Sequence, residues 1–113
     1  MMKYQLNKLN ELAAGDQEFI ETIVVAFLEE VPQDLNELKL AIGQGDFESI
    51  YQYAHKLKPN LDLLGMEFAK NSILTIENEA KGGRDINLIK SLMPDAANYV
   101  DEAIIELKKD FNL

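Results

Sequence analysis

The chain has 113 residues, of which 47% are hydrophobic, and this length predicts a single domain, residues 1–113, with one buried core. Its 20 acidic and 11 basic residues give a net charge of −9, which argues against binding to nucleic acid or to an anionic membrane surface. The sequence contains no cysteine, which excludes disulfides, thiolate zinc sites and cysteine nucleophiles.

The first residues lead directly into an amphipathic pattern, without the apolar region that a secretion signal needs. No apolar run approaches the roughly 20 residues that cross a bilayer. We therefore expect a soluble, cytoplasmic protein. The initial Met1 favours a standalone protein over a domain of a larger kinase.

Glycine and proline divide the sequence into helical segments, and apolar–polar alternation nowhere persists long enough to predict a strand. A short helix is expected from about Asn7 to Ala14 and ends at Gly15. Asp16 has the character of an N-cap for a long second helix that reaches about Ile42. The apolar stripe predicted for this helix consists of Phe19, Ile23, Phe27, Val31, Leu35, Leu38 and Ile42.

Three further helices follow. Asp46 is expected to cap the third, whose apolar residues alternate in spacings of four and three, as is typical of a bundle seam. The fourth begins after Gly65 and the fifth at about Asp85, while Pro32 and Pro94 are expected to kink the second and last helices. We predict an all-α fold: an antiparallel up-and-down four-helix bundle with a short N-terminal capping helix.

His55 is the only histidine, and it follows the seam residue Ala54, which predicts an exposed position at the edge of the core. Its neighbours on the helix, three and four residues away, are Tyr51, Gln52, Lys58 and Pro59. None is a carboxylate, so no metal site is predicted, because di-iron bundles use Glu-x-x-His pairs and zinc proteases combine histidines with a glutamate. Lys58 instead favours an anionic group on the imidazole, although a lone histidine can also be an ordinary surface residue.

Residues 54–65 read Ala-His-Lys-Leu-Lys-Pro-Asn-Leu-Asp-Leu-Leu-Gly. This segment resembles the signature of histidine-containing phosphotransfer (HPt) domains, Ala-His-x-Leu-Lys-Gly followed by small residues and Leu-Gly. The similarity extends over nearly the whole chain, including Asp46 before the histidine helix and Ile76-Glu77 before a glycine-rich turn.

The resemblance implies a phosphoryl carrier without kinase activity of its own. His55 would take a phosphoryl group from the aspartate of one response-regulator receiver domain and pass it to the aspartate of another. The implied partners are receiver domains and a hybrid sensor histidine kinase, and a monomer is expected. The chain would need no cofactor, because the receiver holds the magnesium ion.

The resemblance also implies roles for particular residues. The phosphorylated atom would be Nε2 of His55, and Lys58 would contact the phosphoryl oxygens. Glu77, 22 residues after His55, falls where the family places a Glu or Gln that accepts a hydrogen bond from Nδ1–H, although it could equally be one more solvated carboxylate. The docking surface for partners is expected to include Tyr51, Gln52, Lys56, Pro59 and Asp62.

Pro59 is a departure from the family signature, which usually has glycine after the lysine. A proline frees the carbonyl of His55 four residues earlier and alters the surface that a receiver approaches, or it only shapes the helix.

Two other functions compete with phosphoryl transfer. The dimerisation bundle of a histidine kinase has an acidic residue after its histidine, where this chain has Lys56, and the chain has no glycine-rich phosphate loop. The second alternative is a bundle that binds a partner without transferring a phosphoryl group. The presence of both His55 and Lys58 favours transfer.

Overall fold

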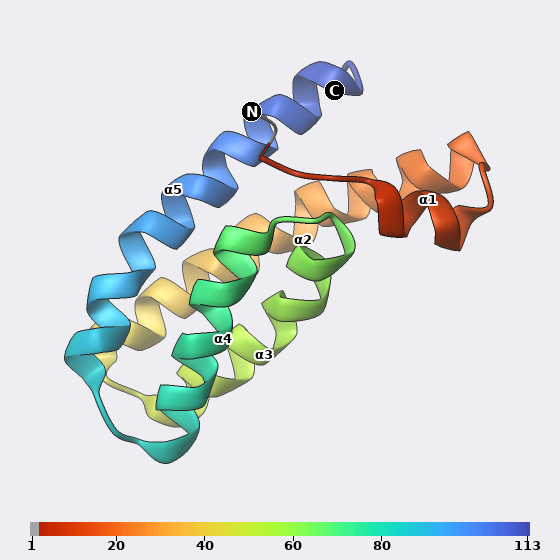
Figure 1. Cartoon of the computed structure of the whole chain (residues 1–113). Coiled ribbons are helices and arrows are strands. Elements are labelled where there is room, and N and C mark those ends of the chain that lie inside the picture. Colours follow the sequence, from red (N-terminus) through yellow and green to blue (C-terminus); the bar gives the residue numbers. More distant parts are fainter. Residues whose placement is uncertain (1–2) are drawn as a thin grey trace.

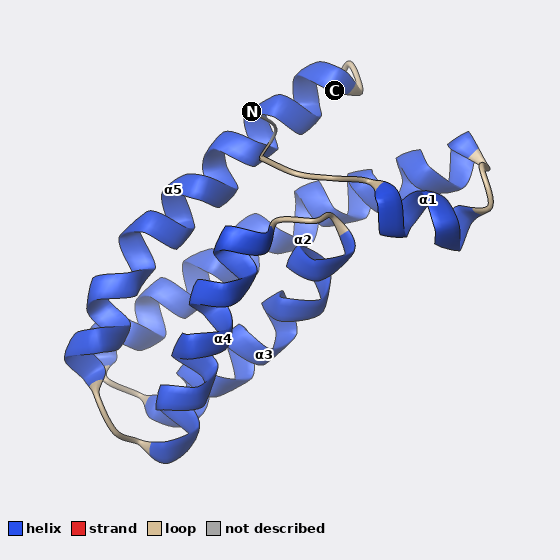
Figure 2. Cartoon of the chain, viewed as in Figure 1, coloured by secondary structure: helices blue, strands red, loops and turns tan. Residues whose placement is uncertain are grey.

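The computed structural model describes residues 3–113, which form five helices and no strand (Figures 1 and 2). In chain order the helices are α1 (Asn7–Ala13), α2 (Gln17–Gln44), α3 (Phe47–Leu63), α4 (Glu67–Gly82) and α5 (Ile86–Asp110). The all-helical prediction is confirmed. Helix α2 contacts α3 and α5, and α4 contacts these same two helices, so the four helices enclose one core. The short α1 lies along the first part of α2 (Figure 1).

Aspartate side chains cap the N-termini of three of the helices. Asp16 before α2 and Asp46 before α3, both predicted as caps, accept hydrogen bonds from the amide three residues later at 3.2 Å. Asp85 does the same for α5 at 3.1 Å. These bonds satisfy amides that the first turn of a helix leaves without a partner. The caps therefore fix where each helix begins.

Two prolines predicted to kink helices lie inside them. Pro32 is within α2 and Pro94 within α5, and both helices continue through the proline. A bend at either residue stays a prediction.

Among residues 3–113, none of the helices is both long enough and apolar enough to cross a membrane.

The apolar stripe predicted for α2 is right from Phe27 onward and wrong at its beginning. Phe19 is exposed and Ile23 is only half-buried, whereas Ile20 and Val24 are buried. The reason is that α1 packs on this end of α2 (Figure 1), so the buried face there is turned by one residue from the stripe of the main core. The sequence pattern alone does not show which neighbour covers each turn.

The segment before α1 connects α5 to the turn between α3 and α4. The backbone amide of Gln5 donates to the carbonyl of Leu64 at 2.9 Å, and the buried Tyr4 donates its hydroxyl to Asp110. Gly65 lies directly against Gln5 with a φ of +65°, and a Cβ at this position would lie 2.7 Å from atoms of Gln5. The turn that follows the histidine helix therefore requires glycine.

Candidate functional site

His55 lies in the middle of α3 with its side chain 63% exposed, as predicted. The preceding Ala54 is fully buried in the core. One residue of an α-helix turns the side chain by about 100°, which places His55 at the edge of the packed face. The imidazole stacks on the ring of Tyr51, one turn earlier, with a centroid separation of 5.7 Å and an interplanar angle of 14°.

Glu77 of α4 connects the two residues that the motif singles out. Its Oε2 lies 2.6 Å from Nδ1 of His55, and its Oε1 accepts from Nζ of Lys58 at 2.9 Å. The Glu77 side chain is only 7% exposed, so the reading as a solvated carboxylate is wrong.

The charge of Glu77 determines the hydrogen position on the imidazole. Burial by itself would raise the pKa of Glu77, but the hydrogen bonds and charges of Lys58 and His55 outweigh burial and hold this pKa below its ordinary value. An ionised carboxylate can only accept hydrogen bonds, so Nδ1 of His55 donates. In the neutral ring Nε2 then carries the lone pair that can attack an electrophile.

Lys56 turns toward the opposite side of α3. Its Nζ donates to Oδ1 of Asp34 on α2 at 3.0 Å, and this hydrogen bond raises the pKa of Lys56. The Lys56 side chain is 60% exposed, whereas that of Asp34 is 7% exposed. His55 is therefore flanked by two lysines, each paired with a buried carboxylate of a neighbouring helix.

A hollow of about 510 Å³ opens beside His55 between α3 and α4. It is lined by His55, Lys58, Pro59, Asp62, Lys70 and Leu74. Pro59 does not end the helix, since α3 continues to Leu63. The site thus combines an exposed imidazole, two ammonium groups and a partly apolar wall.

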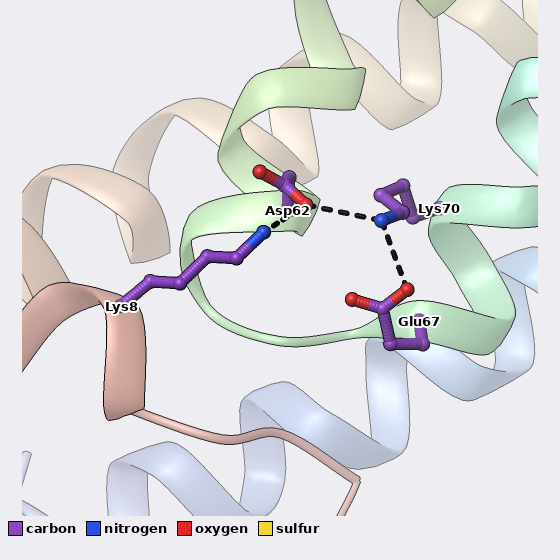
Figure 3. Close-up of polar contacts among 4 residues, drawn as sticks. All are labelled: Lys8, Asp62, Glu67 and Lys70. Carbon is purple, nitrogen blue, oxygen red and sulfur yellow. Dashed lines mark hydrogen bonds and ion pairs between the residues drawn. The ribbon is translucent and has the colours of Figure 1, made fainter.

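Figure 3 shows an ion-pair cluster around Asp62. Asp62 lies two turns of α3 beyond His55, and Asp62 and Lys70 also line the hollow. Oδ1 of Asp62 accepts from Nζ of Lys8 at 2.8 Å and from Nζ of Lys70 at 3.0 Å, and Lys70 also pairs with Glu67 at 2.9 Å. The hydrogen bonds from Lys8 and Lys70 lower the pKa of Asp62. The cluster joins α1, α3 and α4 next to the site.

The predicted docking residues do not all lie together. Pro59 and Asp62 line the hollow and Tyr51 stacks on His55, whereas Lys56 reaches toward α2. Gln52 is exposed on α3 and is not among the residues that line the hollow.

Sequence reasoning missed three residues around His55: Asp34, Lys70 and Leu74. Lys70 and Leu74 precede Glu77 by seven and three residues and therefore share its face of α4, a spacing that could have predicted them. Asp34 gave a different signal, since it is a carboxylate inside the apolar stripe of α2.

Residues 3–113 hold no group of three or more His, Cys, Asp or Glu side chains placed to bind a metal ion.

A family model described as Hpt domain matches residues 22–109. The match covers most of the chain and runs from the first turns of α2 to the last turn of α5. The chain therefore belongs to the Hpt domain family. Neither a comparison with curated proteins nor one with solved structures gave a match.

Proposed function

We propose that this chain is a histidine phosphotransfer protein of a two-component phosphorelay, which carries a phosphoryl group on Nε2 of His55 between the aspartates of receiver domains. The observation that carries the proposal is an exposed imidazole whose Nδ1 is bound to a buried, ionised carboxylate, in a chain of the Hpt domain family. In this proposal α2 to α5 form an antiparallel up-and-down bundle that presents His55 on its outside.

The forward step begins with the lone pair of Nε2. It forms a bond to the phosphorus of the receiver's aspartyl phosphate, and the bond between phosphorus and the aspartate oxygen breaks. The aspartate leaves as a carboxylate with that electron pair. The imidazole gains positive charge while Nδ1 keeps its hydrogen, and the carboxylate of Glu77, 2.6 Å away, stabilises this charge. Return of the phosphoryl group to a second aspartate reverses each of these changes.

Lys58 has a second role in the proposal. Its Nζ is bound to Glu77, but an ammonium group has three hydrogens to donate. We assign one of them to a phosphoryl oxygen. The positive charge of the ammonium group then stabilises the negative charge that the phosphoryl oxygens carry during transfer. The hollow between α3 and α4 is the proposed contact surface for the receiver, with Pro59, Asp62 and Leu74 on its wall.

The proposed protein is a carrier and not a kinase. Binding of magnesium and activation of the aspartate belong to the receiver, while this chain supplies an oriented imidazole and one ammonium group. Its proposed partners are receiver domains and a hybrid sensor histidine kinase, its proposed state is a monomer, and its proposed location is the cytoplasm.

The experiment is a loading and transfer assay. The protein is incubated with phosphoramidate, and mass spectrometry locates the phosphoryl group. Magnesium and a panel of receivers from the same organism are then added. We expect label on His55, none on a His55→Gln variant, and rapid loss of label to one or a few receivers. Label that no receiver removes would favour an interaction module that does not transfer a phosphoryl group.

A further inference from the structure

Tyr51 supports one face of the His55 ring, a contact that the proposed transfer step does not use. The two ring centroids are 5.7 Å apart and the ring planes differ by 14°. This separation lies within the roughly 4.5–7 Å range of favourable aromatic pairs. Because helical side chains lean toward the N-terminus of their helix, His55 leans onto the residue four positions earlier, which is Tyr51.

Tyr51 is itself held in position. It is half-buried and packs against the hydrophobic core. This packing limits the motion of the Tyr51 ring.

The two contacts of His55 restrict different motions of its ring. The hydrogen bond to Glu77 fixes which edge of the imidazole faces α4, but this one contact leaves the ring plane free to tilt. The stack on Tyr51 blocks the swing of the ring toward the beginning of α3. A side chain that is 63% exposed would otherwise sample several rotamers. Together the two contacts limit the directions in which Nε2 can point.

We propose that Tyr51 is a positioning residue that holds the imidazole plane so that Nε2 points along the line of attack on phosphorus. The inference rests on the proposed phosphoryl transfer, in which the new bond from Nε2 and the breaking bond to the leaving group are nearly in line. Tyr51 forms no bond in that step and acts only through the orientation of His55. Its hydroxyl has no part in the role, so phenylalanine can replace tyrosine.

The test uses phosphoramidate, a donor too small to touch a docking surface. Nε2 attacks its phosphorus, the bond between phosphorus and nitrogen breaks, and the nitrogen, which already carries three hydrogens in phosphoramidate at neutral pH, leaves as ammonia with the electron pair. We expect Tyr51→Leu to load His55 more slowly by about twofold to tenfold, the factor that a stacking contact supplies. Tyr51→Phe should load at the original rate. Transfer from each loaded variant to a receiver should change by a similar factor.

Tyr53→Leu is the matched control, because Tyr53 is also a half-buried tyrosine of α3 that packs against the core. Its loading rate should equal that of the unaltered protein. If Tyr51→Leu loads at the original rate and only its transfer to receivers slows, Tyr51 is a docking residue and the inference is overturned. If Tyr51→Phe loads as slowly as Tyr51→Leu, the stacking argument is also wrong.

If Tyr51→Leu does not fold, NMR of the unaltered protein still tests the stack of Tyr51 on His55. NMR should show contacts between the ring protons of Tyr51 and His55, with the His55 ring protons shifted upfield by the neighbouring aromatic ring. Absence of both signals would overturn the stack in solution. Failure of the proposed function has a different signature, since the unaltered protein would then carry no label on His55 or would pass none to a receiver.

Discussion

Glu77 is the residue on which the chemistry of His55 most depends. Its buried carboxylate accepts from Nδ1–H, which leaves Nε2 as the attacking atom of the proposed transfer. A change to alanine removes both the orientation of the ring and the countercharge to the imidazolium. We expect Glu77→Ala to slow loading by phosphoramidate by about tenfold to a hundredfold, a range that misplacement of a reacting group can produce.

Glu77→Gln separates the two contributions. The amide oxygen can still accept from Nδ1–H, so the ring stays oriented while the countercharge is lost, and loading should be intermediate. Glu79→Gln is the control, because Glu79 lies on the same helix and pairs with Arg84 instead of His55. Equal loading rates for Glu77→Ala and the unaltered protein would reject the role of Glu77.

His55, Lys58 and Glu77 could be found from the sequence for two different reasons. His55 and Lys58 lie one turn apart on a single helix, so their proximity follows from helical spacing alone. Glu77 lies on another helix, and only the resemblance to a family predicted its place beside His55. The pairing of Lys56 with Asp34 was not predictable, because it depends on how α2 packs against α3.

At the scale of the helices, Asp62 connects α1, α3 and α4 through Lys8 and Lys70 (Figure 3). These hydrogen bonds lower the pKa of Asp62 in the folded protein. A group with a lowered folded-state pKa contributes stability above its unfolded pKa, about 3.9, and loses that contribution as the pH falls through the folded value. The cluster should therefore stabilise the fold at neutral pH and not in acid.

We expect Asp62→Asn to lower the free energy of unfolding at about pH 7, and the difference from the unaltered protein to shrink as the pH falls below about 4. Urea denaturation at a series of pH values measures this. Glu37→Gln serves as the control, because within residues 3–113 Glu37 is an exposed carboxylate without an ion pair. A difference for Asp62→Asn that stays constant with pH would contradict the role of the ion pairs.

The turn between α3 and α4 depends on a glycine. Gly65 has a φ of +65° and no room for a Cβ beside Gln5. Gly65→Ala should therefore lower the free energy of unfolding by about 1–3 kcal/mol, the usual cost of a strained backbone conformation. Gly43, inside α2, has open space around it, so Gly43→Ala should raise stability by roughly 0.5–1 kcal/mol. Equal effects of the two changes in urea denaturation would contradict this explanation.

The helices themselves were more predictable than the packing of their faces. The capping aspartates located the first residues of α2 and α3, because a cap acts within one turn of the chain, whereas the end of α2 was expected at about Ile42 and lies at Gln44. Phe19 was wrongly expected in the core, since α1 rather than the other long helices covers the first turns of α2. The neighbour of each face is decided by contacts that are distant in sequence.

For the whole molecule, we propose that one exposed histidine on a helical bundle carries a phosphoryl group between two receivers. The most direct test starts with phosphate on the aspartate of one receiver and measures its arrival on a second receiver. We expect arrival only when this chain is present, with labelled His55 as the intermediate, and none with the His55→Gln variant. Transfer that proceeds equally well with His55→Gln would contradict the carrier role of His55.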